Sequence, residues 1–165
     1  MSDTTAPTLR VDRATPADVP LLMSLIRALG EYEKIAHEVK TTESALEEHL
    51  FGAHPFAEAL VARYDASPAG YAMFCSKYSS FVGPGMYLED VFVRPEYRAR
   101  GVGKAMLRAV ARVARERDCF RLEWSVLNWN ETAIGFYKRI GADVHPDWRT
   151  CRMSRDAIAR LADSG

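Results

Sequence analysis

The chain of 165 residues lacks the features that mark several large classes of protein. It has three cysteines, Cys75, Cys119 and Cys151, with no CxxC pair, and its four histidines have no zinc-ligand spacing. No apolar run approaches the length of a membrane span, and the chain starts with a short polar stretch rather than an export signal. We therefore expect a reduced, cytoplasmic protein with no metal site and no membrane contact.

Net charge is also missing, because 22 Lys and Arg residues balance 22 Asp and Glu residues. Nothing in this balance favours a nucleic-acid partner. The local distribution is uneven: residues 94–117 carry eight basic and two acidic side chains, whereas residues 31–48 carry six acidic and two basic ones. This pattern fits an anionic cofactor and a cationic substrate, and two solvated helix faces are the alternative.

The length and a hydrophobic content of 48% predict a single domain over residues 9–165 after a flexible tail over residues 1–8. Hydrophobic periodicity predicts strands over residues 9–13, 56–64, 69–78, 86–93, 120–126 and 143–154. Helices are predicted from Thr15 to Leu29 with Gly30 as the stop, over 42–51, 102–117 and 130–140, and as a turn over 157–161. Short connections favour an antiparallel meander, and a helical crossover requires strands 86–93 and 120–126 to be parallel.

A basic, glycine-containing loop joins the strand over 86–93 to the helix over 102–117. Its pattern, Arg98-x-x-Gly101-x-Gly103, places glycines where helical N–H groups are still free and the helix dipole is positive. Such a site suits a phosphate or pyrophosphate. The mononucleotide P-loop and the dinucleotide fingerprint are both absent. A glycine-relieved turn with solvated arginines is the structural alternative.

Four motifs in order resemble the GNAT acetyltransferase superfamily: Tyr87 to Val93, the glycine loop, Trp129-Asn130-Glu131 and Phe136-Tyr137-Lys138-Arg139. Within it the chain looks most like the diamine acetyltransferases, which act on spermidine, spermine or thialysine. The resemblance covers about Val11 to Met153. It implies an α/β fold with a mixed, mostly antiparallel twisted sheet, helices on both faces and a central splayed parallel strand pair.

The resemblance implies acetyl-CoA as the acetyl donor. In this family the glycine loop holds the pyrophosphate, main-chain groups of the preceding strand pair with the pantetheine and polarise the thioester, and the next helix start contacts the CoA arm. The corresponding residues here are Val91, Phe92, Val93, Arg98, Ala99, Arg100, Gly101, Val102, Gly103, Lys104, Asn130, Glu131 and Tyr137.

Two residues match catalytic roles. Tyr137 matches the family's general acid, because a phenol is still protonated at neutral pH and can protonate the departing thiolate. Glu89 is the candidate base, because a primary amine arrives protonated and must lose a proton before it attacks. Adjacent strand residues face opposite ways, so Glu89 and Asp90 share a pocket only if a bulge intervenes. We favour Glu89 and interpret Asp90 as a structural acceptor of backbone N–H groups.

The family positions that line the amine site are Tyr32, Glu33, Glu89, Glu123, Trp124 and Ser125. Glu33 as a solvated helix-end acid and Trp124 as a core aromatic are open alternatives. Ser79-Ser80-Phe81 stands where polyamine-specific members have an acid followed by Pro-Trp. This departure makes the chain look more like the thialysine branch, which acts on lysine-like amino acids and small diamines.

Together these features predict an N-acetyltransferase in which a small primary amine attacks acetyl-CoA directly in a ternary complex. Acetylation of a protein or peptide amine is one alternative, and a non-catalytic CoA-binding module is another. The family usually forms homodimers, so the resemblance implies a homodimer here.

Overall fold

The computed structural model describes residues 7–164, so most of the predicted tail over residues 1–8 lies outside the described part. The chain divides after Ser125 into two compact units, and each unit is described by itself below. Within residues 7–164, no helix combines the length and the apolar content that crossing a membrane requires.

The first unit contains a five-stranded sheet in the order β1-β2-β3-β4-β5. Its strands are β1 (Leu9–Arg13), β2 (Glu58–Tyr64), β3 (Ser67–Ser79), β4 (Gly83–Val93) and β5 (Arg121–Glu123). The pairs from β1 to β4 are antiparallel, and β4 pairs with β5 in parallel. The predicted meander and the predicted parallel pair are therefore confirmed.

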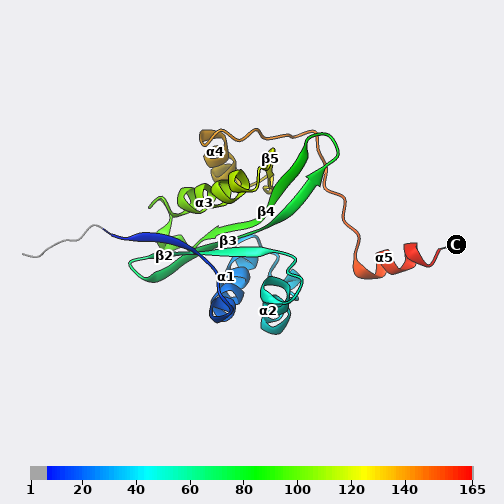
Figure 1. Cartoon of the computed structure of the whole chain (residues 1–165), viewed down its shortest axis with the longest axis horizontal. Helices are drawn as coiled ribbons and strands as arrows, with labels where there is room; N and C mark the ends of the chain where they lie inside the picture. Colours follow the sequence, from blue (N-terminus) through cyan, green and yellow to red (C-terminus); the bar gives the residue numbers. More distant parts are fainter. Residues whose placement is uncertain (1–6, 165) are drawn as a thin grey trace, which may run out of the picture. The chain divides into compact units, whose positions relative to one another are not determined.

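Helices cover both faces of this sheet, as predicted (Figure 1). Helices α1 (Val19–Tyr32) and α2 (Glu43–Phe51) lie on one face, and α3 (Val102–Glu116) lies on the other. Single 3-10 turns occupy η1 (Pro16–Asp18), η2 (Ala36–Glu38) and η3 (Pro95–Tyr97). The Thr42 hydroxyl accepts a hydrogen bond from the Ala45 N–H at 3.2 Å, which confirms Thr42 as the N-cap of α2.

Gly30 does not end the first helix, so that prediction is wrong. Helix α1 continues to Tyr32 and Gly30 is buried within it. A Cβ atom added at Gly30 would come within 2.9 Å of Val39 Cγ2 and 3.2 Å of Ala36 Cα. The glycine is thus explained by the close approach of η2 rather than by helix termination.

The predicted start of the strand over 69–78 also needs correction. Ser67 and Pro68 belong to β3, because the turn before it is made by Asp65 and Ala66, whose φ angles are 47° and 64°. Such positive angles at both turn residues match the right-handed twist of a two-residue hairpin.

The second unit begins at Val126 and contains α4 (Glu131–Arg139) and α5 (Arg155–Ala162). The strand predicted over 143–154 is wrong: these residues form no strand and all of them are exposed. A strand needs a hydrogen-bonded neighbour, and this segment has none among the described residues. The parallel pair consequently lies at one end of the five-strand order.

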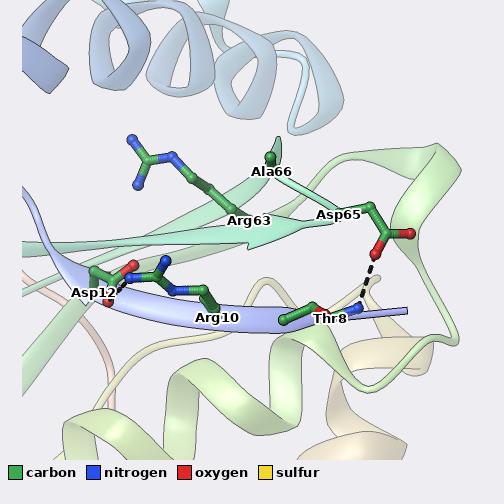
Figure 2. A pocket seen from close by; sticks show the side chains of 6 residues that line it. All are labelled: Thr8, Arg10, Asp12, Arg63, Asp65 and Ala66. Atoms are coloured by element: carbon green, nitrogen blue, oxygen red, sulfur yellow. Dashed lines mark hydrogen bonds and ion pairs between the residues drawn. The ribbon is translucent and has the colours of Figure 1, made fainter. Parts of the chain in front are cut away.

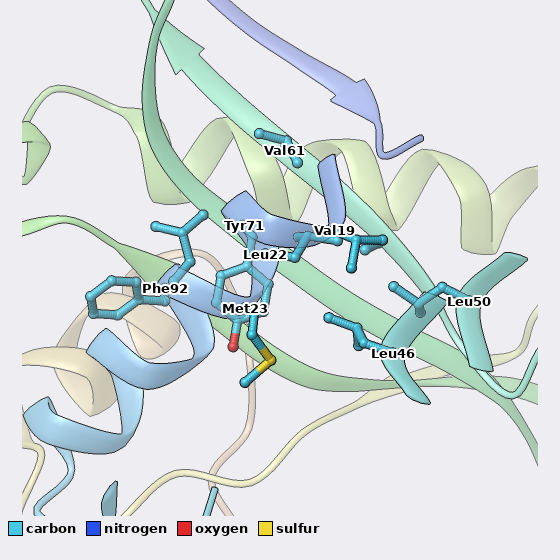
Figure 3. Close-up of a cluster of buried hydrophobic side chains, with 10 residues drawn as sticks. Val19, Leu22, Met23, Leu46, Leu50, Val61, Tyr71 and Phe92 are labelled. Carbon is cyan, nitrogen blue, oxygen red and sulfur yellow. The ribbon is translucent and has the colours of Figure 1, made fainter. Parts of the chain in front are cut away.

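One hydrophobic cluster of the first unit lies between the sheet and helices α1 and α2 (Figure 3), and α3 buries a second set of apolar residues. Leu22, Met23 and Leu25 of α1 are fully buried and belong to the same cluster as Tyr71 of β3 and Phe92 of β4. Burial of each such side chain contributes about 1.5–3 kcal/mol. Tyr71 is part of this packing, so the polar groups that share its face of the sheet lie on the side covered by α1 and α2.

Candidate active site

The glycine loop has the backbone that the sequence predicts. Gly101 is the N-cap of α3 and has φ +81°, in the left-handed region that favours glycine. A Cβ atom added there would meet nothing within 4 Å, so the glycine is needed for its backbone angle rather than for space. Ala99 is also left-handed, with φ 60°. The loop therefore turns sharply into α3 and leaves the positive end of the helix open.

Both loop arginines rest on aromatic rings. The Arg98 guanidinium lies 4.5 Å from the centre of the Tyr32 ring, and its Nε donates a hydrogen bond to the Val93 carbonyl at 3.1 Å. The Arg100 guanidinium lies 5.4 Å from the Tyr64 ring and 5.9 Å from the Tyr97 ring. These contacts orient two positive charges beside the start of α3, where an anion would bind.

Strand β4 has a free edge next to this loop. Strand β5 pairs only with Gly85 to Tyr87, so residues 88–93 have no strand partner on that side within residues 7–164. On the other side Val93 pairs with Gly70, where an added Cβ would come within 2.2 Å of the Phe92 carbonyl oxygen. Pairing with β5 ends after Tyr87, as the predicted splay requires, and on this edge the main chain over 91–93 has no strand neighbour among the described residues.

A β-bulge occurs at Glu89. Leu88 pairs with Phe74, and Asp90 pairs with Met73, which directly precedes Phe74. Glu89 therefore has no partner in β3. The extra residue changes the alternation of β4: Tyr87, opposite Cys75, and Asp90, opposite Met73, share one face of the sheet although three positions separate them. The condition under which Glu89 and Asp90 can approach one pocket is therefore met.

Asp90 is not the acceptor of backbone N–H groups that the sequence reasoning favoured. Its carboxylate accepts a hydrogen bond of 2.8 Å from the Tyr71 hydroxyl. Burial raises the pKa of Asp90, the Tyr71 hydrogen bond lowers it and the Glu89 charge raises it again. Burial likewise raises the pKa of Tyr71, and the neighbouring Asp90 raises it further. Asp90 therefore belongs to a group of acidic side chains on this face of the sheet and does not serve to hold backbone N–H groups.

Glu33 faces the same region from the end of α1. Burial raises the pKa of Glu33, and the charge of Asp90 raises it further. Both carboxyls line an open pocket of about 320 Å³, together with Glu38, Lys40 and apolar residues of α1 and the segment after it. Glu33 is half-buried rather than fully solvated, and its contact with the amine stays a prediction.

Glu123 of β5 and the two residues after this strand are the other predicted acceptor-site residues of the first unit. Glu123 pairs with Tyr87 and is engaged by two cations, with its carboxylate 3.0 Å from the Lys77 ammonium and 3.7 Å from the Arg121 guanidinium. Ser125 Oγ lies 2.9 Å from the Tyr87 hydroxyl. Trp124, between them, is half-buried.

The remaining predicted residues lie in the second unit. Asn130 caps α4, because its side-chain oxygen accepts a hydrogen bond from the Ala133 N–H at 3.2 Å. Glu131 is the first residue of α4 and is exposed, whereas Tyr137 is buried, with 8% of its surface accessible. Their placement toward the glycine loop stays a prediction.

Tyr71 and Lys77 are not among the residues predicted for the site. Their relation to the acidic residues depends on the pairing register of β3 with β4, which no motif in the chain encodes.

A second depression, of about 530 Å³, lies on β1 and the β2–β3 turn (Figure 2). There the Thr8 N–H donates a hydrogen bond to Asp65 at 2.8 Å, and Arg10 lies 3.5 Å from Asp12. Its basic and acidic groups are in equal number, and none of them belongs to the motifs discussed above.

Comparison with known proteins agrees with this geometry. Residues 23–142 match the family model described as Acetyltransferase (GNAT) family. A thialysine N-epsilon-acetyltransferase from Mus musculus is 35% identical over 164 residues, covering 93% of this chain and 96% of the mouse protein. An L-ornithine N5-acetyltransferase from Arabidopsis thaliana is 32% identical, covering 92% of this chain and 87% of the plant protein.

Solved structures show the same fold. An aminoglycoside N-acetyltransferase, crystallised in complex with CoA, aligns with a TM-score of 0.73 at 18% identity, covering 91% of this chain and 97% of the other. The matched family model, the relatives and the fold together show that the chain belongs to the GNAT acetyltransferase family and is an N-acetyltransferase.

Proposed function

We propose that this protein transfers the acetyl group of acetyl-CoA to a primary amine of a small cationic substrate, either a thialysine- or lysine-like amino acid or a diamine or polyamine. The observation that carries the proposal is the bulge at Glu89, which allows Glu89, Asp90 and Glu33 to act on one region of the sheet face. Their negative charges attract a protonated amine. The names of the mouse and plant relatives point to the same class of acceptor.

For the donor, the residues present fit an extended ligand that carries a pyrophosphate. The left-handed turn at Gly101, the two ring-supported arginines and the start of α3 suit the pyrophosphate, and the free edge of β4 over 91–93 suits the pantetheine. Asn130 and Glu131 would contact the rest of the CoA arm. The donor supplies an activated acetyl thioester, and no covalent enzyme intermediate is part of the proposal.

Glu89 would take a proton from the ammonium group, directly or through water, because the amine attacks only in its neutral form. The main-chain edge over 91–93 would stabilise charge that develops on the carbonyl oxygen. Tyr137 would donate a proton to the departing thiolate. Tyr32, Trp124 and Ser125 would line the acceptor site. We further propose a homodimer in the cytoplasm, where acetyl-CoA and free amino acids are metabolites.

The test is CoA release from acetyl-CoA by the purified protein with thialysine, lysine, putrescine, spermidine and an amine-bearing peptide. The proposal predicts turnover with at least one small amine at a higher kcat/KM than with the peptide. A higher kcat/KM for the peptide would favour the alternative, acetylation of protein amines. Initial rates measured against both substrates should give intersecting lines, whereas parallel lines would contradict a ternary complex.

A further inference from the structure

Lys77 lies on the same face of the sheet as the acidic groups. Tyr71, Met73, Cys75 and Lys77 alternate along β3, so their side chains share one face. Burial raises the pKa of the Cys75 thiol, Glu89 raises it further, and Lys77 lowers it. The charges of Lys77 and Glu89 therefore both lie near the Cys75 thiol.

The group around Lys77 carries an unbalanced positive charge. Lys77 and Arg121 share the single carboxylate of Glu123, at 3.0 Å and 3.7 Å. The Lys77 side chain is 43% exposed and that of Arg121 is 45% exposed, so both can meet a ligand from solvent. Two cations against one carboxylate leave one positive charge available to an anion.

The spacing between this cationic group and the acidic groups suits a short molecule with opposite charges at its ends. The Lys77 ammonium lies 5.5 Å from the centre of the Tyr87 ring. Tyr87 precedes Glu89 by two residues, and because Glu89 is the bulged residue this step is at most about 7 Å along the strand. The Tyr87 hydroxyl and Ser125 Oγ, 2.9 Å apart, add hydrogen-bonding groups at the cationic end. An extended lysine-sized molecule spans this distance.

We propose that Lys77 binds the α-carboxylate of the acceptor while the carboxylates around Glu89 hold its side-chain amine. Lys77 is then a specificity-determining residue, because it attracts the α-carboxylate of an amino acid. The matching diamine keeps the ammonium at that end but has a hydrogen in place of the carboxylate, so Lys77 repels it. This inference rests on the proposed function. Glu123, which the resemblance places at the amine site, would then hold Lys77 and Arg121 in position.

The experiment compares kcat/KM for lysine and for its decarboxylated analogue, 1,5-diaminopentane, in the wild type and in Lys77→Met. Removal of the ammonium should lower the lysine-to-diamine ratio about five- to tenfold, chiefly through KM for lysine. Lys77→Arg should restore most of the ratio. The matched control is Arg108→Gln, which removes one positive charge from an exposed position of α3 and should leave the ratio unchanged.

A second variant separates this inference from the original assignment of Glu123. Glu123→Gln frees Lys77 and Arg121 from their carboxylate, so it should raise the lysine-to-diamine ratio. If Glu123 instead bound the amine, the same variant would lower kcat/KM for both acceptors, and the inference would be wrong.

The outcomes also distinguish this inference from the proposed function. Turnover of both acceptors with the same ratio in wild type and Lys77→Met would overturn the role of Lys77 and leave the proposed function intact. An equal loss for both acceptors in Lys77→Met would likewise overturn it, since the residue would then be only structural. No turnover of any small amine by the wild type would overturn the proposed function, and the inference with it.

Discussion

Replacement of Tyr71 by Phe tests the acidic face at its most buried point. The Tyr71 hydroxyl donates the 2.8 Å hydrogen bond to Asp90, and the ring belongs to the core cluster, so the variant keeps the packing and removes one donor. A hydrogen bond to a charged group contributes about 2 kcal/mol, which corresponds to about 4–8 °C in Tm for a chain of this size. We expect that loss at pH 8.

The loss should be smaller in acid. Because burial raises the pKa of Asp90 in the folded state, the carboxyl is protonated in the folded protein below that raised pKa, and ionised above it. Ionisation of the buried group lowers stability as pH rises, and the Tyr71 hydroxyl offsets part of this effect. In acid only a neutral hydrogen bond is lost, at about 1 kcal/mol.

Urea unfolding at pH 8 and pH 4 measures both free energies of unfolding. Tyr78→Phe is the matched control, since Tyr78 lies on the same strand and is 74% exposed. Its stability should match the wild type at both pH values. An equal loss at both pH values in Tyr71→Phe, or no loss, would refute the reasoning that the hydroxyl stabilises an ionisable Asp90.

Three further predictions concern other parts of the chain. Gly101→Ala should cost about 1 kcal/mol in unfolding free energy, because φ is +81°, and should raise KM for acetyl-CoA; an unchanged KM would contradict the loop's role. The hydrogen bond from Arg117 lowers the pKa of Glu58, and Arg13 also pairs with this carboxylate. Glu58→Gln should therefore cost about 1 kcal/mol of unfolding free energy at pH 7, and less as pH falls through that lowered pKa. Equal losses in urea unfolding at pH 7 and pH 3 would argue against the ion pairs. Tyr137→Phe should lower kcat about 100-fold or more with an unchanged circular dichroism spectrum, and full turnover would remove it from the mechanism.

Much of the fold follows from local patterns in the sequence. The N-cap at Thr42, the amphipathic helix after Gly101 and the alternating strands β1 to β4 each depend on residues close together in the chain. The parallel pairing of β4 with β5 follows from the crossover rule. These features could therefore be predicted without knowing any long-range contact.

The errors have long-range causes. The sequence pattern at Gly30 is typical of a helix stop. In the structure a larger side chain there would clash with Ala36 of η2 and with Val39, the residue after η2, and the local pattern does not reveal these contacts. The segment over 143–154 has strand-like composition, yet a strand also needs a partner, and none is present among the described residues.

The candidate site could likewise be predicted only where local patterns define it. The glycine loop and Glu89 could be proposed from spacing and resemblance. The role of Asp90 could not, because it depends on one extra residue in β4 opposite β3 and on the hydroxyl of Tyr71, nineteen positions earlier. Register of this kind is set by the whole sheet.

The central claim is that this protein acetylates a small primary amine with the help of Glu89. Its most direct test is mass spectrometry of the product formed from acetyl-CoA and lysine or thialysine, with wild type and Glu89→Gln at equal concentration near pH 7. The account predicts a mono-acetylated amine with the wild type, and a rate at least about 100-fold lower with Glu89→Gln that recovers partly at higher pH, where more amine is neutral. An undiminished rate in Glu89→Gln, or no acetylated amine with the wild type, would contradict it.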